Sequence, residues 1–159
     1  MFHEVVEDGT VSGVDAVGAN GTPDVDAGEV TPGALLAAFE VMVRESVAEA
    51  GRERVGVETG VDEAAVEAAA AGDAADLSVD DAAAIVAVTA DRDADALVAE
   101  LRDHLLMGMA TAVLDVDTVA AGIDADLTGQ EVQQALEGRA GMTLEQLAEV
   151  MAVIERRKR

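Results

Sequence analysis

The sequence predicts an all-α protein of about eight helices, arranged as two tandem four-helix units behind an irregular acidic N-terminal arm. Three observations support this fold class. Apolar residues recur at helical spacing, capping side chains precede most of these stretches, and the stretch 55–88 recurs in degenerate form at 121–153. We therefore expect an arm over residues 1–30, a first unit over 31–91 and a second unit over 92–159.

The repeat has an offset of 66 residues, which falls to 65 after a one-residue deletion. At the first offset Gly56, Val57, Val61, Val66, Ala69 and Gly72 recur as Gly122, Ile123, Leu127, Val132, Ala135 and Gly138. The offset of 65 relates six further pairs of positions, in which Met142, Thr143, Leu144, Ala148, Val150 and Val153 follow Leu77, Ser78, Val79, Ala83, Ile85 and Val88. A long period that carries apolar and glycine positions together indicates duplication of a supersecondary unit.

The arm and the first helix differ sharply in pattern. Residues 1–30 are rich in glycine and aspartate and show no apolar period, so we expect irregular structure there. Thr31 then supplies a hydroxyl N-cap before Pro32, the pair that a helix start prefers. A helix should follow as far as Gly51, with one apolar face formed by Leu35, Leu36, Phe39, Val43 and Val47.

Three shorter helices complete the first unit. Residues 52–59 predict a short second helix, and Asp62 is placed to cap a third that ends at Gly72. The hydroxyl of Ser78 predicts the start of the fourth, because it can accept from the amide three residues later.

The second unit is expected to repeat this plan. Asp93 or Asp95 should cap a long helix whose apolar face runs through Leu97, Leu101, Leu105, Met109 and Val113. Residues 117–122 predict the short helix, after which the turn is a few residues longer than in the first unit.

Two capping boxes mark the last two helices. Thr128 with Glu131 should open a helix that ends at Gly138, a residue tolerant of the left-handed conformation. Thr143 with Gln146 should open the final helix, whose apolar face carries Leu144, Leu147, Val150, Met151 and Ile154.

The charge is extreme: 33 acidic residues against 10 basic ones give a net charge of −23. Half of the chain is nevertheless apolar, which differs from the composition of disordered proteins. Adaptation to a salt-rich cytosol explains such a surface, since molar salt screens charge repulsion within roughly 3 Å; mimicry of nucleic acid or cation buffering is the alternative. The N-terminus lacks a basic flank and an apolar run, so we expect a cytoplasmic protein that does not bind membranes.

The helix order is similar to a known DNA-binding fold. Residues 54–66, Gly72 and 77–79 of the first unit, and 118–123 with 127–138 of the second, resemble the helix-turn-helix domain of phage-repressor and Cro-like regulators. The likeness covers residues 32–90 and 94–157. The whole chain also resembles an uncharacterised small acidic haloarchaeal protein family, a likeness that supports salt adaptation and implies no activity.

The resemblance implies that the third helix of a unit enters the major groove of DNA. That helix has no Arg, Lys, Asn or Gln in the first unit, whereas the second unit offers Gln130, Gln133, Gln134 and Arg139. The C-terminal Arg156, Arg157, Lys158 and Arg159 could contact phosphate or an acidic partner surface. A simpler interpretation is that these four residues complement the dipole of the last helix. We name these eight residues as the possible nucleic-acid or partner contact.

No pattern indicates catalysis, a cofactor or a metal centre. The chain has no cysteine, only His3 and His104 as histidines, and no nucleophile or phosphate-binding motif. The run that begins at Asp91 imitates a calcium loop but has Ala96 at the position that requires glycine. We therefore expect no catalytic, cofactor-binding or metal residues.

The sequence favours a non-enzymatic binding module, derived from a helix-turn-helix scaffold, that engages a protein partner in a high-salt cytosol. The alternative is a DNA-binding, transcription-type regulator that uses the second unit, although the charge disfavours DNA. A third possibility is an enzyme with an unrecognised carboxylate site.

Overall fold

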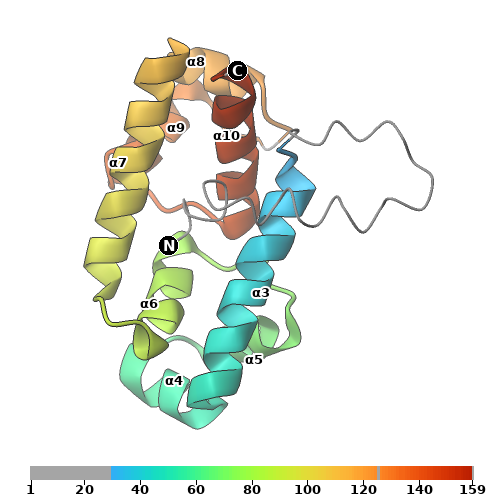
Figure 1. Cartoon of the computed structure of the whole chain (residues 1–159), viewed down its shortest axis with the longest axis vertical. Helices are drawn as coiled ribbons and strands as arrows, with labels where there is room; N and C mark the ends of the chain where they lie inside the picture. The colour runs from blue at the N-terminus through green and yellow to red at the C-terminus, as the bar shows by residue number, and fades with distance from the viewer. Residues whose placement is uncertain (1–29, 125, 159) are drawn as a thin grey trace, which may run out of the picture.

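The computed structural model describes residues 30–124 and 126–158, and within them the chain is all-α with eight helices, as predicted (Figure 1). The predicted arm, apart from Val30, lies outside the described residues. The helices are α3 (Pro32–Ala50), α4 (Arg52–Thr59), α5 (Glu63–Ala71), α6 (Val79–Thr89), α7 (Ala94–Ala112), α8 (Val116–Ala121), α9 (Gly129–Leu136) and α10 (Leu144–Arg157). None of the described helices combines the length and apolar character needed to cross a membrane.

Most of the predicted caps form. The side-chain oxygens of Thr31, Ser78 and Asp93 accept from amides three residues later, at 3.1, 3.0 and 2.8 Å. Asp93, rather than Asp95, therefore caps α7. Asp62 holds the N-cap position of α5 but makes no side-chain cap hydrogen bond, so the prediction of a carboxylate cap there is wrong.

Both predicted capping boxes are complete. Thr128 Oγ1 accepts from Glu131 N at 3.2 Å while Glu131 Oε1 accepts from Thr128 N at 3.1 Å. Thr143 and Gln146 exchange the same two bonds at 3.1 and 3.0 Å. These reciprocal bonds satisfy amides that a helix start leaves without a partner, which fixes where α9 and α10 begin.

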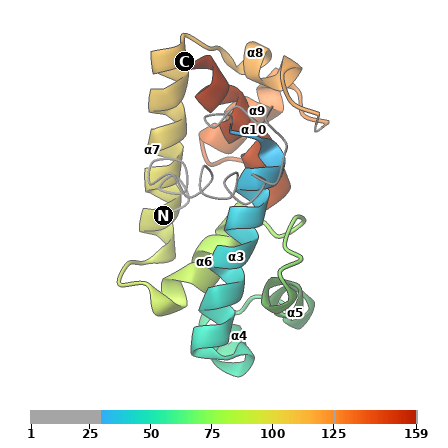
Figure 2. The same cartoon turned by 45° about the vertical axis from the view of Figure 1, so that its right-hand side comes forward.

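The helices pack around one shared hydrophobic core. Helix α3 packs against α5, α6 and α10, and α10 also contacts α7 and α8. Figures 1 and 2 place α4 and α5 at one end of the molecule and α8 and α9 at the other, with the long α7 along one side. Buried residues of both halves form a single cluster, so the two predicted units do not have separate cores.

The two halves also meet through main-chain hydrogen bonds. An isolated antiparallel bridge joins Ser78 to Thr143, two positions that are equivalent in the repeat. Val79 N donates to the carbonyl of Met142 at 2.8 Å, and Leu144 N donates to the carbonyl of Leu77 at 2.9 Å. These bonds join the segment before α6 to the segment before α10.

Small side chains allow close contact between α7 and α10. A Cβ added at Gly108 of α7 would lie 2.7 Å from Ile154 Cγ2 of α10, closer than carbon atoms pack. Leu144, Leu147 and Phe39 fill the core with no exposed surface. The absence of a side chain at Gly108 therefore allows α7 and α10 to pack closely together.

The predicted packing role of Val113 is wrong. The repeat aligns Val113 with Val47, which is buried on α3, but α7 ends at Ala112 and the Val113 side chain is 90% exposed. Val113 also adopts the left-handed conformation, with φ 55°. Helix α7 ends at Ala112, about one turn before the position that the offset of 66 gives from Ala50, so Val113 does not join its apolar face.

Candidate functional site

The three predicted contact glutamines differ in exposure on α9. This helix buries Gly129, Val132 and Leu136, which leaves Gln130 and Gln133 exposed and Gln134 half-buried. Gln133 is not free to contact a base, because its Nε2 donates to Glu137 Oε1 at 3.0 Å. Gln130 therefore remains the most accessible member of the set.

Glu137 also engages the predicted contact Arg139, whose guanidinium forms an ion pair with its carboxylate. The hydrogen bond from Gln133 and then the contact with Arg139 lower the pKa of Glu137 below its usual value. Glu137 is therefore ionised at neutral pH, between two residues that the sequence assigned to nucleic-acid or partner contact. A negative charge there opposes approach of a phosphate.

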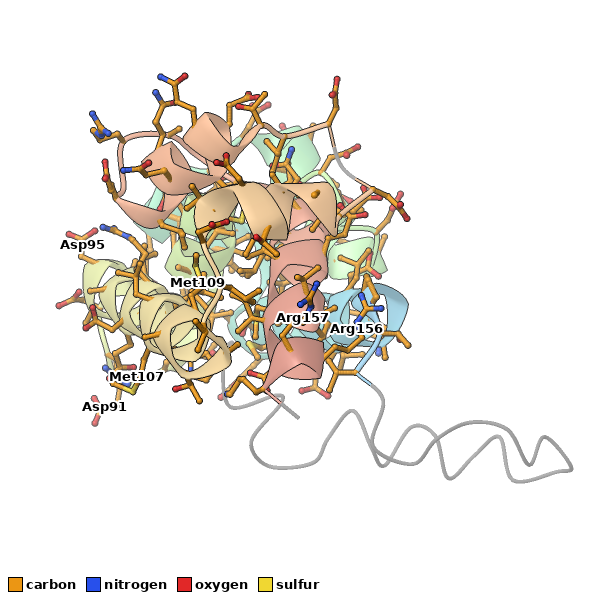
Figure 3. The ribbon with its side chains drawn as sticks, turned by 90° about the horizontal axis from the view of Figure 1, so that it is seen from above. Asp91, Asp95, Met107, Met109, Arg156 and Arg157 are labelled. Atoms are coloured by element: carbon orange, nitrogen blue, oxygen red, sulfur yellow. The ribbon has the colours of Figure 1, made fainter. Side chains whose placement is uncertain are left out.

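The C-terminal contact residues lie on the last turn of α10 and beyond it. Arg156 and Arg157 are exposed, and Figure 3 shows both projecting from this turn. Together with Thr118, Gly122 and Val153 they line a hollow of about 240 Å³ between α8 and α10. Lys158 pairs with Glu155 at 3.1 Å, while the predicted contact Arg159 lies outside the described residues.

The structure does not join the predicted contacts into one site. Among the described residues, no hydrogen bond or ion pair connects the α9 group with the C-terminal group. The loop that carries Arg139 leads into the start of α10, whereas Arg156 and Arg157 lie on its last turn, which Figure 1 shows beside α8.

Sequence reasoning missed three exposed apolar side chains on α7 and directly after it. We call them the α7 stripe and define it as Leu106, Met107 and Val113. Their exposed fractions are 48%, 70% and 90%. Figure 3 shows Met107 pointing away from the body, whereas Met109 points inward and is 7% exposed. One signal was available: three successive apolar residues, 105–107, cannot all face one core because each helical step turns the side chain by about 100°.

Sequence reasoning also missed a cavity of about 290 Å³ that contains two arginines. It lies between α7, the start of α6 and the loop joining α9 to α10. Arg102 and Arg139 line it above a floor of buried aliphatic side chains. No repeat position or motif marks Arg102, so only the fold reveals this placement.

The acidic run that starts α7 does not gather into a metal site. Asp93 is used as the cap of α7, and Figure 3 shows Asp91 and Asp95 lying apart. In the part of the chain that the structure describes, no three histidines or carboxylates are placed to hold a metal ion. His104 instead faces Glu155, with 3.6 Å between Nε2 and Oε1.

The described residues thus form an all-helical protein with exposed apolar side chains on and just after α7 and a cavity lined by Arg102 and Arg139. The chain belongs to DUF5791, a family of unknown function, whose pattern matches residues 35–157. No curated protein and no solved structure matches the chain.

Proposed function

We propose that this protein is a non-enzymatic binding module that engages a protein partner through the α7 stripe. The observation that carries the proposal is the exposure of Leu106 and Met107, successive residues of α7, and of Val113, the residue directly after this helix. An exposed apolar surface of this kind, edged by polar residues, is typical of an interaction site.

The conformation of Val113 supports this assignment. A residue with a Cβ in the left-handed region costs roughly 1–2 kcal/mol, and a β-branched residue there is a marked outlier. Val113 also gains almost nothing from burial, because its side chain is 90% exposed. Residues with strained backbone conformations are often found at binding sites.

A high-salt cytosol favours an apolar contact over a charged one. Molar salt reduces the screening length to about 3 Å, which weakens ion pairs at a rim. Burial of apolar surface is not screened in this way, and structure-making salts strengthen it. The net charge of −23 fits such an environment, and so supports a hydrophobic docking surface.

The chemistry of the partner follows from the surroundings of the stripe. Asp103 is exposed one helical turn before Leu106 and Met107, on the same side of α7. We therefore expect the partner to present an apolar groove or helix face flanked by Lys or Arg. Descent from a helix-turn-helix scaffold remains part of the proposal, supported by the order of the helices.

The test is capture from native lysate in molar KCl with wild-type protein and two variants. Leu106→Glu with Met107→Glu adds two charges to the stripe, whereas Ala37→Glu with Ala48→Glu adds two charges to an exposed side of α3. We expect one protein to be retained by the wild type and the α3 variant and lost with the stripe variant. Equal retention by all three folded proteins would refute the proposal.

DNA binding through the second unit is the second candidate function. Its support is that Arg156 and Arg157 are exposed and form no ion pair within the described residues. If the candidate is correct, a DNA fragment should bind at low salt, and deleting residues 156–159 should flatten the dependence of log affinity on log salt. No binding by the folded protein at any salt concentration would exclude it.

A further inference from the structure

The arginine-lined cavity has a mostly polar accessible lining, with Arg102 and Arg139 in its wall and tightly packed aliphatic side chains beneath. Val79 of α6, Leu101 and Leu105 of α7, and Leu147 of α10 are buried side chains that line it. Small-molecule sites use a few placed polar groups to orient the ligand, and their volumes are typically about 300–1,000 Å³. At about 290 Å³ the cavity has room for one small ligand.

Arg102 is the group that makes the cavity unusual in this acidic chain. Four described arginines, at 52, 54, 92 and 139, pair with glutamates. Arg102 forms no ion pair in the described part, and it is half-buried whereas Arg44, Arg156 and Arg157 are exposed. The chain has 33 acidic residues, yet none of those described pairs with the half-buried Arg102, so its positive charge is available to a ligand.

Gly138 leaves the space that this guanidinium occupies at the cavity wall. A Cβ at Gly138 would lie 2.5 Å from Arg102 Nη1, so the arginine rests in space that any other residue would fill. Gly138 also has φ 79°, which glycine adopts without strain. Arg139, the next residue, lines the same cavity while its guanidinium contacts Glu137.

We propose that this cavity binds a small organic anion whose carboxylate or phosphate is held by Arg102. Guanidinium groups bind both anions in a two-pronged geometry. Among the residues that line the cavity, Asp80 at the start of α6 is the acidic group that opposes the ligand, and Glu137 outside the lining stays paired with Arg139.

The site also joins the two halves of the molecule. Val79 and Asp80 come from the first half, and the arginines come from the second. The cavity adjoins the main-chain bond from Val79 N to the carbonyl of Met142. A bound anion therefore stabilises the contact between the halves, and the thermal midpoint should rise with ligand concentration.

The experiment is an NMR titration of the full chain at constant KCl with hexanoate, hexyl phosphate, 1-hexanol and hexylammonium. We expect the amides of Ala140 and Gly141 to shift with hexanoate, with hexyl phosphate or with both, and the stronger of the two identifies the anion. Arg102→Gln should weaken that binding by about 10- to 100-fold, the loss typical of a charged hydrogen bond. Arg44→Gln, the matched control on an arginine that lies against the equivalent Gly72, should leave it unchanged.

A second variant separates loss of the site from loss of the fold. Asp80→Asn removes the opposing charge and should tighten anion binding by about two- to fivefold, which a damaged protein would not do. The proposal is overturned if no anion binds, if 1-hexanol or hexylammonium binds as tightly as the anions, or if Arg102→Gln binds as well as Arg44→Gln. Weaker binding by Asp80→Asn would also overturn it.

Discussion

Replacing Val113 by glycine should stabilise the fold even though it removes three carbon atoms. The left-handed conformation at φ 55° costs a residue with a Cβ roughly 1–2 kcal/mol. Glycine avoids that cost, but it also gives the unfolded chain more conformational freedom, which lowers the free energy of unfolding by about 0.4–1 kcal/mol. Since the side chain is 90% exposed, almost no burial is lost. We expect the free energy of unfolding to rise by about 0.5–1 kcal/mol.

Urea unfolding followed by far-UV circular dichroism, with KCl held constant, measures this change. Ala112→Gly is the matched control, because Ala112 is the last residue of α7 and glycine there should lower stability by up to about 1 kcal/mol. If Val113→Gly destabilises the protein as Ala112→Gly does, the assigned strain at Val113 is wrong. The same variant should weaken partner capture, so stability and binding should change in opposite directions.

Three further predictions concern the core, the helix contact and pH. Leu144→Ala should lower the free energy of unfolding by about 2–5 kcal/mol in the same urea assay, because the side chain is fully buried. Gly108→Ala should lower it by about 1–3 kcal/mol, since the new methyl group would meet Ile154; no change would show that α7 and α10 lie farther apart. NMR titration should find the pKa of Glu137 below its usual value, and Gln133→Ala should raise it. A lowered pKa means that this carboxylate stabilises the fold above its unfolded pKa and stops doing so as pH falls through the folded one.

The sequence predicted the helices well because the signals that define them are local. Thr31, Ser78, Thr128 and Thr143 act on amides three residues away, and that relation is visible without any tertiary structure. The cap of α8 was missed: Asp115 accepts from Thr118 N at 2.8 Å, so the helix begins at Val116 rather than at 117.

What the sequence could not predict depends on which helices meet. The repeat aligned Val113 with a buried residue, but α7 ends at Ala112 and leaves Val113 exposed. Arg102 looked like one more surface arginine until the loop after α9 placed Gly138 against it. Gln133 and Arg139 looked like free hydrogen-bond donors, yet both engage Glu137. Local patterns report a residue's neighbours along the chain, whereas a site depends on contacts between distant segments.

Photo-crosslinking from the α7 stripe tests the binding function most directly. A photoreactive residue at position 107 and, in a second protein, at exposed position 48 of α3 would be irradiated in native lysate with molar KCl. The proposed function predicts one dominant protein adduct from position 107 that is absent from position 48 and is lost when Leu106 is replaced by Glu. Equal adducts from both positions, or none from position 107, would contradict it.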